Sequence, residues 1–355
     1  MPRDEAFAAY YNARVRGMKS RLLDSAQLDN MLDSHDVNQV IDTLLDSPYK
    51  EDLAEARARL EGAEAIEEAV TRNMVRTFQK LVALAGDSFT ELTNLLFSRW
   101  DLRSVKQLLR LRHAGESAPD IVQAGMMPGP RLTLALMQDF AERETMRGLV
   151  GALAAWNREL CGCLEAHMDA YEETGELKVL EEALDRAYFT DNVKAYEHKR
   201  DEDHQFVCKL LQMEIDRINL RTILSLRDDE AGGVDAAMDR LLPGGTLSDK
   251  LLRRMAEAES AERAMELLGP TAYRSFIEGL YRLIQTHDFS HMERYFEWLL
   301  LKQLKQLARQ HSLSIAVVMY YMWAKYNEVV NLRLIARGKA RHLPTGQVRE
   351  EIFYV

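Results

Sequence analysis

The chain has 355 residues, 47% of them hydrophobic, which is enough to bury a sizeable core divided over two or three structural units. Its formal net charge of −10 argues against nucleic acid as the main partner and against a polybasic hold on anionic lipid, because both need a concentrated basic face. The odd count of three cysteines (Cys161, Cys163 and Cys208) gives no disulfide framework and favours a reducing compartment, and Cys161 and Cys163 lack the second pair of thiols that a tetrahedral metal site needs.

Helix is predicted almost throughout the chain. Residues 1–11 have no apolar run, so no signal peptide is expected. In runs such as 65–85 and 206–227, apolar residues recur at steps of three and four, and no alternating β-branched run indicates a strand. The most apolar stretch, residues 313–324, is far shorter than the ~20 residues of a membrane span, so membrane association is expected only through a partner.

Two helix starts are predicted from capping boxes, in which a hydroxyl accepts a backbone N–H and an acid three residues later reaches back. Residues 88–91 predict Ser88 as one cap, and residues 246–249 predict Thr246 as the other.

An internal repeat is the most informative feature. Three segments share the order Asn or Asp, Leu, Arg, and a β-branched residue two positions later, and they begin at Asp101, Asn219 and Asn331. Their leucines are 118 and 112 residues apart. On a helix, each leucine and the branched residue share one face, which is expected to be core. The preceding polar residue and the following arginine lie about 100° to either side, where they can satisfy a neighbouring helix or a partner.

Each repeated helix is followed by similar proline and glycine punctuation, which ends one helix and restarts another. These segments are residues 127–132, 242–247 and 343–348.

The start of the chain looks like a further, partial copy, because residues 12–19 resemble residues 331–339. The matched positions downstream are Leu28 with Leu247, and Tyr49 with Tyr273. A chain that begins and ends with the same element predicts three similar helical units about a pseudo-threefold axis, one of them formed by both chain ends. The predicted units are residues 1–62 with 286–355, residues 63–172, and residues 173–285.

The two ends carry a family resemblance. Residues 10–23 (YYNARVRGMKSRLL) and residues 328–351 resemble the N- and C-terminal signatures of the C subunit of V/A-type ATPases, which corresponds to the d subunit of the eukaryotic vacuolar enzyme. The chain length and the threefold repeat fit as well, although Asp101 stands where the other copies have Asn. The resemblance implies an all-α funnel that receives the central shaft of a rotary ATPase, rests on the proteolipid ring and transmits torque without chemistry of its own.

The same resemblance implies the partners and the location. The partners would be the central shaft subunits of D and F type and the cytoplasmic side of the proteolipid ring, in a machine that links ATP to proton or sodium transport. The chain would be a peripheral subunit at the cytoplasmic face of the membrane, a monomer when isolated, with no cofactor.

The candidate residues for partner contact or for bridging between units come from the repeat and from the two signatures. They are Tyr11, Arg14, Arg16, Arg103, Arg221, Glu328, Asn331 and Arg333. The three repeated arginines have two open readings: internal salt bridges, with Glu328 or Asp216 as the acids, or contact with the shaft or ring.

Enzyme alternatives rest on short strings. Gly338 and Lys339 lack the loop and the hydroxyl of a phosphate-binding P-loop. His287 and His291, spaced i and i+4, give a helical metal-dependent hydrolase as an alternative, although no third ligand is evident. The acidic triplet at 228–230 has no second acidic motif to complete a magnesium site.

A generic helical adaptor is the remaining alternative. Stacked solenoid repeats have periods of about 20 to 50 residues, so spacings of 112 and 118 favour a closed set of larger units.

Overall fold

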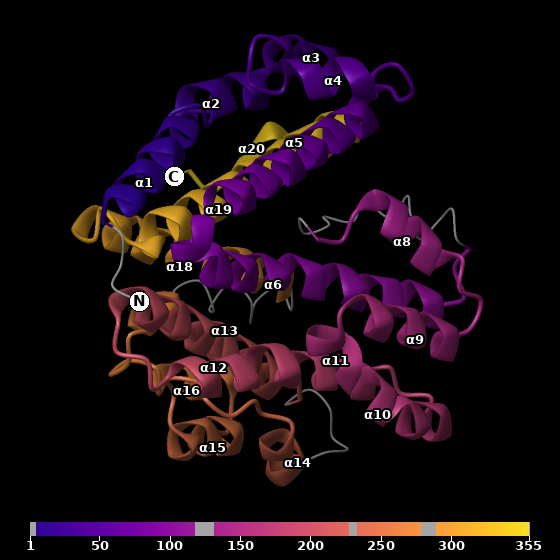
Figure 1. The fold of residues 1–355 in the computed structure, drawn as a ribbon, viewed down its shortest axis with the longest axis vertical. Coiled ribbons are helices and arrows are strands. Elements are labelled where there is room, and N and C mark those ends of the chain that lie inside the picture. The colour runs from indigo at the N-terminus through magenta and orange to yellow at the C-terminus, as the bar shows by residue number, and fades with distance from the viewer. Residues whose placement is uncertain (1–4, 118–130, 227–232, 278–288, 355) are drawn as a thin grey trace. The chain divides into compact units, whose positions relative to one another are not determined.

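The computed structural model describes residues 5–117, 131–226, 233–277 and 289–354. These ranges are helical with connecting turns and contain no strand, which confirms the all-α prediction (Figure 1). They divide into two compact units. Unit 1 contains residues 5–104, 131–137 and 300–354, and unit 2 contains 105–117, 138–226, 233–277 and 289–299. The pseudo-threefold funnel stays a prediction.

Unit 1 joins both ends of the chain. Its helices are α1 (Glu5–Lys19), α2 (Ser25–Asp33), α3 (Val37–Leu45), α4 (Lys50–Ala56), α5 (Gly62–Leu84), α19 (Ile315–Ala340) and α20 (Thr345–Glu350). Three further helices contribute residues to both units: α6 (Gly86–His113), α8 (Leu134–Ala141) and α18 (Phe289–Gln310).

Helix α19 is the centre of unit 1. Of its 26 residues, 21 are buried, and it packs against α1, α2, α3, α5 and α20; Figure 1 shows α5 and α19 side by side. A helix that is buried on all sides must be enclosed by other helices, which accounts for the apolar residues 315–324 of the stretch identified in the sequence. Aromatic packing adds to this core, since the rings of Trp323 and Trp100 meet edge to face with centroids 5.6 Å apart.

The break between α5 and α6 corrects one predicted cap. Helix α6 begins at Gly86, so Ser88 lies inside its first turn and is not the N-cap. Gly86 has φ +54°, and a Cβ there would collide with the Phe7 ring. Because only glycine adopts this backbone without strain and leaves that space, the glycine decides where the helix starts.

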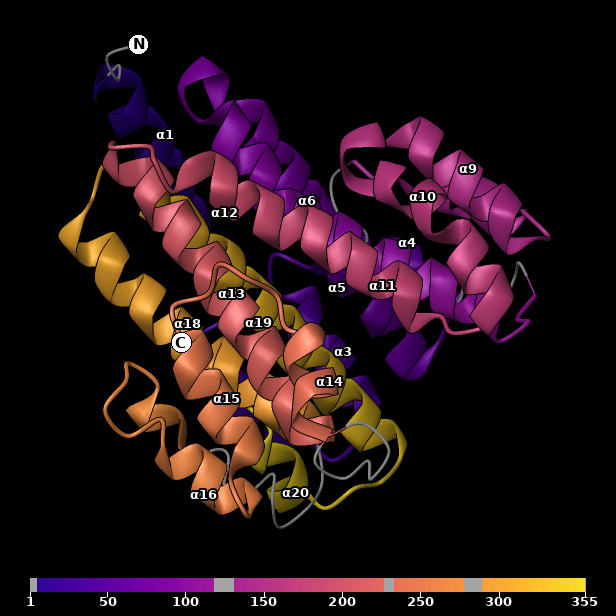
Figure 2. The ribbon, with the colours of Figure 1, turned by 90° about the horizontal axis from the view of Figure 1, so that it is seen from below.

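Unit 2 is built around α13 (Glu202–Leu226), which packs against α12 (Asp191–Tyr196), α14 (Gly233–Asp239) and α15 (Asp249–Glu257) (Figure 2). Its other elements are α9 (Met146–Trp156), α10 (Arg158–Thr174), α11 (Lys178–Asp185), the π-helical turn η1 (Arg186–Thr190), α16 (Ala261–Glu266) and the 3₁₀ turn η2 (Arg274–Phe276).

The repeat lies on the long helices α6, α13 and α19, and its predicted core positions are confirmed. All six are at most 3% exposed: Leu102, Val105, Leu220, Ile223, Leu332 and Ile335. In the described part of the chain, no helix combines the length and the apolar character needed to cross a membrane.

Candidate functional site

The asparagine of the repeat ties its helix to the segment that follows. In α19, Asn331 Nδ2 donates to the carbonyl of Phe353 at 2.9 Å, and the Phe353 N–H donates back to Oδ1 at 3.4 Å. In α13, Asn219 makes the same paired contact with the backbone of Leu242, at 2.9 and 2.8 Å. A carboxamide can do this because it carries one donor and one acceptor side by side.

The first copy has Asp101 in place of asparagine, and it is fully buried. A carboxylate has no N–H to offer, so it cannot form the paired contact. Burial raises the pKa of Asp101 to about 7, while the Arg131 charge and the Leu132 backbone N–H act to lower that pKa. Burial therefore disfavours the charged form of Asp101, whereas the neutral asparagines of the other two copies have their hydrogen bonds satisfied.

A buried carboxylate, Glu328, joins both ends of the chain within unit 1. It lies three residues before Asn331 and accepts hydrogen bonds from the Tyr49 hydroxyl and the Leu23 backbone N–H. Lys325 Nζ lies 3.0 Å from the same carboxylate and 2.8 Å from the Tyr49 oxygen. Burial raises the pKa of Tyr49, and the Glu328 charge raises it further, so the phenol stays protonated as the donor.

Asp216 is the corresponding carboxylate of unit 2, three residues before Asn219. It accepts from the Tyr273 hydroxyl at 2.6 Å, from the Thr246 hydroxyl and N–H, and from the Leu247 N–H. A Cβ on Gly245 would collide with its Oδ1. Burial raises the pKa of Asp216 against these donors, which lower it.

The two carboxylates show that residues 24–49 and 248–273 repeat, with a constant offset of 224. Three pairs of equivalent residues show this offset: the N-caps Asp24 and Ser248, the N-caps Asp36 and Ser260, and the tyrosines Tyr49 and Tyr273.

This offset matches Leu28 with Leu252, so the predicted match of Leu28 with Leu247 is wrong by five residues. It also corrects the second capping prediction. Ser248 caps α15, while Thr246 donates to Asp216 instead.

The three repeated arginines have three different environments. Arg103 donates to the Tyr326 hydroxyl at 2.7 Å and lies over that ring. The buried Arg333 donates to the hydroxyl of Thr71, and burial lowers its pKa. Arg221 forms an ion pair with Glu293 on the surface. Neither Glu328 nor Asp216, the acids that the sequence indicated, pairs with an arginine among the described residues.

The N-terminal signature residues divide into buried and exposed ones. Tyr11 is buried, donates to the carbonyl of Leu81 at 3.0 Å, and has its pKa raised by burial. Arg14 and Arg16 are exposed, and Arg16 Nη2 donates to the carbonyl of Ser312 at 2.6 Å. Of the eight predicted residues, only Arg14, Arg16 and Arg221 therefore present a charged group on the surface of their own unit.

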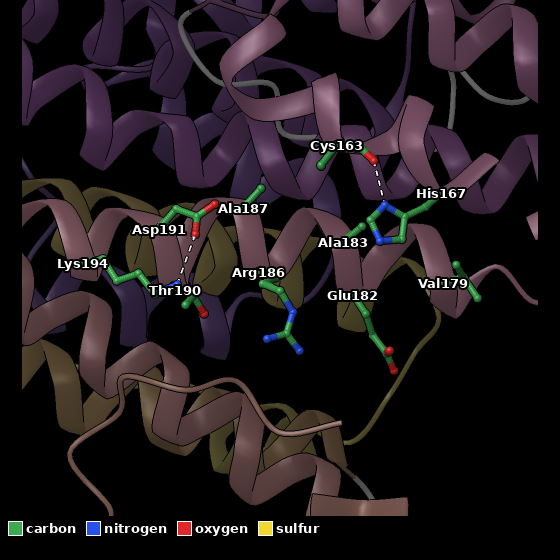
Figure 3. Close-up of a pocket in the computed structure, with 10 residues that line it drawn as sticks. All are labelled: Cys163, His167, Val179, Glu182, Ala183, Arg186, Ala187, Thr190, Asp191 and Lys194. Carbon is green, nitrogen blue, oxygen red and sulfur yellow. Dashed lines mark hydrogen bonds and ion pairs between the residues drawn. The ribbon is translucent and has the colours of Figure 1, made fainter. Parts of the chain in front are cut away.

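Unit 2 has a cavity of about 380 Å³ beside the π-helical turn, and several of its polar groups contact other groups of the chain (Figure 3). His167 Nδ1 lies 2.8 Å from the carbonyl of Cys163, and the Thr190 hydroxyl donates to the carbonyl of Pro243 at 3.3 Å. Burial raises the pKa of Cys163 to about 11, so its thiol is protonated and unreactive at neutral pH.

The described residues contain no group of three or more His, Cys, Asp and Glu side chains placed to hold a metal ion. Of the two histidines of the hydrolase alternative, His287 lies outside the described residues, and only the backbone of His291 is described, in α18. The acidic triplet at 228–230 also lies outside the described residues.

Lys325, Tyr49 and Tyr273 were not predicted as site residues. Their signals were the i, i+3 spacing of Lys325 to Glu328 and the matched tyrosines of the repeat.

Comparison with known proteins gives a consistent result. The profile of the ATP synthase (C/AC39) subunit family matches residues 11–351. The C subunit of the A-type ATP synthase of Methanococcoides burtonii is 27% identical over 347 residues, which cover 97% of this chain and 93% of the relative. The corresponding protein of Thermococcus kodakarensis is 25% identical over 93% of this chain and 86% of its own. The C subunit of the V-type ATP synthase of Deinococcus radiodurans is 26% identical, over 97% of this chain and 90% of its own.

Proposed function

Because the chain belongs to the ATP synthase (C/AC39) subunit family, whose members are structural and not catalytic subunits of the rotary complex, we propose that it is the central-stalk socket. In this role it holds the D- and F-type shaft subunits on one side and the cytoplasmic loops of the proteolipid ring on the other. It passes torque between ATP turnover and proton or sodium transport.

The observation that carries this proposal is the extent of the likeness. The family profile runs from residue 11 to residue 351, so it includes all but the first residue of the N-terminal signature, the whole C-terminal signature and all three copies of the repeat. The proposal extends to a pseudo-threefold funnel of the three predicted units, and to a monomeric protein at the cytoplasmic face of the membrane as a peripheral subunit.

Torque transmission needs a body that does not flex, and the packing of unit 1 supports this requirement. Glu328 connects α19 to Tyr49 and Leu23, which lie 279 and 305 residues away in the sequence. Arg349 ties the C-terminal end to α2 through Asp29 and Asp33. Hydrogen bonds and ion pairs between residues so far apart in the sequence, made around a close-packed helix, oppose relative movement of the chain ends.

Purification of the tagged chain from its native membranes in mild detergent, followed by mass spectrometry, tests the proposal. We expect recovery of the shaft subunits and the proteolipid ring. Recovery of the chain alone, from membranes in which an intact rotary ATPase is demonstrated, would overturn it.

A functional measurement tests the coupling itself. Membranes from cells without the chain should lose ATP-driven ion transport, and adding back the purified chain should restore it. Full transport without the chain contradicts the socket role.

A further inference from the structure

Several long segments of this acidic chain contain no acidic residue, and residues 6–23 and 300–327 are two of them. The sequence has 56 Asp and Glu in 355 residues, yet none occurs in residues 6–23 or in residues 300–327. Both segments belong to unit 1, and the structure brings them together. Helix α1 packs against α19, and Arg16 donates to the carbonyl of Ser312 in the turn before α19. A locally positive surface is therefore formed from parts that are distant in the sequence.

Four cations form this surface, which we call the basic surface: Arg16, Lys19, Lys305 and Arg309. Lys305 and Arg309 lie four residues apart, on one face of α18. Lys19 Nζ lies 4.6 Å from the centre of the Tyr320 ring. Burial lowers the pKa of Lys19, and the charges of Lys305, Arg309 and Arg16 lower it further. Lys19 is thus close enough to the other three cations to be repelled by them.

Nothing in the described part of unit 1 neutralises the basic surface. Among the residues that the structure describes, no carboxylate lies within ion-pair distance of any of the four cations. Other arginines of unit 1 do have carboxylate partners; these are Arg59, Arg72, Arg76, Arg337 and Arg349. Other described cations of unit 1, such as Arg14, Arg21 and Lys80, have no ion pair either, so the basic surface differs from them in that four cations gather at one place.

Helix dipoles explain only part of the arrangement. Arg16 and Lys19 lie in the last turn of α1, and Arg309 lies in the last turn of α18. Each helix C-terminus carries about half a negative charge, so two of them offset roughly one of the four positive charges. A surplus of about three positive charges remains for an external partner.

An apolar side chain lies next to the basic surface. Leu313 follows Ser312, whose carbonyl accepts from Arg16, and Leu313 is 41% exposed. Exposed large apolar residues are few in the described chain, since only Tyr10 and Leu343 join it. An apolar anchor beside a charged rim is the usual composition of a protein–protein interface.

We propose that the basic surface, with Leu313 as its apolar anchor, docks an acidic segment of another subunit of the rotary ATPase. The identity of the complex rests on the proposed function; the chemistry of the docked segment rests on the four unpaired cations. A protein segment fits better than a lipid surface, because Arg16 is already fixed in place by Ser312 and a chain of net charge −10 is repelled by anionic lipid.

The double variant Arg16→Glu/Arg309→Glu tests this docking in the full chain, tagged and expressed in its host. Recovery of the other ATPase subunits at physiological salt should fall at least tenfold. The matched control is Lys80→Glu/Lys250→Glu, which makes the same change of charge at two exposed lysines without an ion pair. The control should recover the complex as the wild type does, and wild-type recovery should fall as salt is raised.

The outcomes separate the two proposals. Failure of the wild-type chain to recover the complex overturns the proposed function. Recovery by the wild type and equally by the double variant overturns the docking surface alone.

Sedimentation with vesicles of one part phosphatidylglycerol to three parts phosphatidylcholine tests the lipid alternative. Binding by the wild type that the double variant loses, with complex recovery intact, assigns the surface to lipid and overturns the proposal. If thermal unfolding shows that the double variant does not fold, the neutral variant Arg16→Gln/Arg309→Gln takes its place, with a smaller but measurable loss of recovery expected.

Discussion

Glu328 in unit 1 and Asp216 in unit 2 are buried carboxylates at equivalent positions of two repeated helices, and each accepts the hydroxyl of an equivalent tyrosine. Only Glu328 has a cationic partner among the described residues, because Lys325 occupies the position that is Met213 in unit 2.

The side-chain lengths differ as well. The backbone at Gly245 lies so close to the shorter Asp216 that a side chain at this position would clash with the carboxylate. In unit 1, where the carboxylate belongs to the longer Glu328, the position equivalent to Gly245 is occupied by Arg21. The same connection between a helix and a loop, through a buried carboxylate, can therefore use a cationic partner or only neutral donors. The two arrangements place different limits on the residue types at neighbouring positions.

The largest effect is expected from Glu328→Ala. Its removal leaves Lys325 charged and buried and leaves the Tyr49 hydroxyl and the Leu23 N–H without an acceptor. Breaking a buried pair in this way costs ~4 kcal/mol in the free energy of unfolding. Urea denaturation measures the loss. Asp216→Ala, which leaves no buried cation, should cost about half as much, and an equal loss for both variants would contradict the role given to Lys325.

The next effect tests the glycine. Gly245→Ala should lower the free energy of unfolding by ~3 kcal/mol, because the new methyl group would displace the Asp216 carboxylate from its donors. Arg21→Ala at the equivalent position of unit 1 should change it by less than ~0.5 kcal/mol, since Arg21 is exposed. Thermal unfolding of both variants provides the measurement, and similar changes in both would show that the two loops do not differ as described.

Asp101→Asn gives the first copy the residue of the other two and should stabilise the protein above neutral pH. The folded-state pKa of Asp101 is raised from 3.8 to about 7, so its contribution to stability is full below pH 3.8 and is lost as the pH rises through 7.

Asparagine does not titrate, so the gain should be close to zero near pH 4 and reach a plateau of ~2 kcal/mol above pH 7.5. This is about half of the ~4 kcal/mol that the full pKa difference allows, because local rearrangement relieves part of the penalty. Urea denaturation from pH 4 to pH 8.5 measures the profile, with Asn219→Asp expected to destabilise over the same range. A gain that does not depend on pH would refute the assignment to Asp101.

The sequence predicted the helices and the core positions of the repeat, because apolar periodicity is a local property that burial enforces. It did not predict the two carboxylate ties. The partners of Glu328 are hundreds of residues away in the sequence, and their proximity depends on the fold.

The register error at Leu28 has a similar cause. Matching Leu28 to Leu247 satisfies the apolar pattern, but the hydrogen bonds of the caps Asp24 and Ser248 set the helix starts and therefore the correct register. Arg16 was predicted from the N-terminal signature, whereas Lys305 and Arg309 join it only because the fold brings the end of α1 to the turn after α18, where Arg16 contacts Ser312.

The smallest effect concerns the repeated arginines and refines the comparison between the units. Arg221→Met removes a surface ion pair with Glu293 and should cost no more than ~0.5 kcal/mol, because solvent screens such pairs. Arg333→Met at the equivalent position of unit 1 should cost ~2 kcal/mol, since Arg333 is 8% exposed and its guanidinium donates to the hydroxyl of the half-buried Thr71. Urea denaturation of both variants at low and high salt measures the difference. The loss in the free energy of unfolding should become smaller at high salt for Arg221→Met alone. A loss that depends on salt for Arg333→Met as well would mean that Arg333 also acts mainly through surface charge.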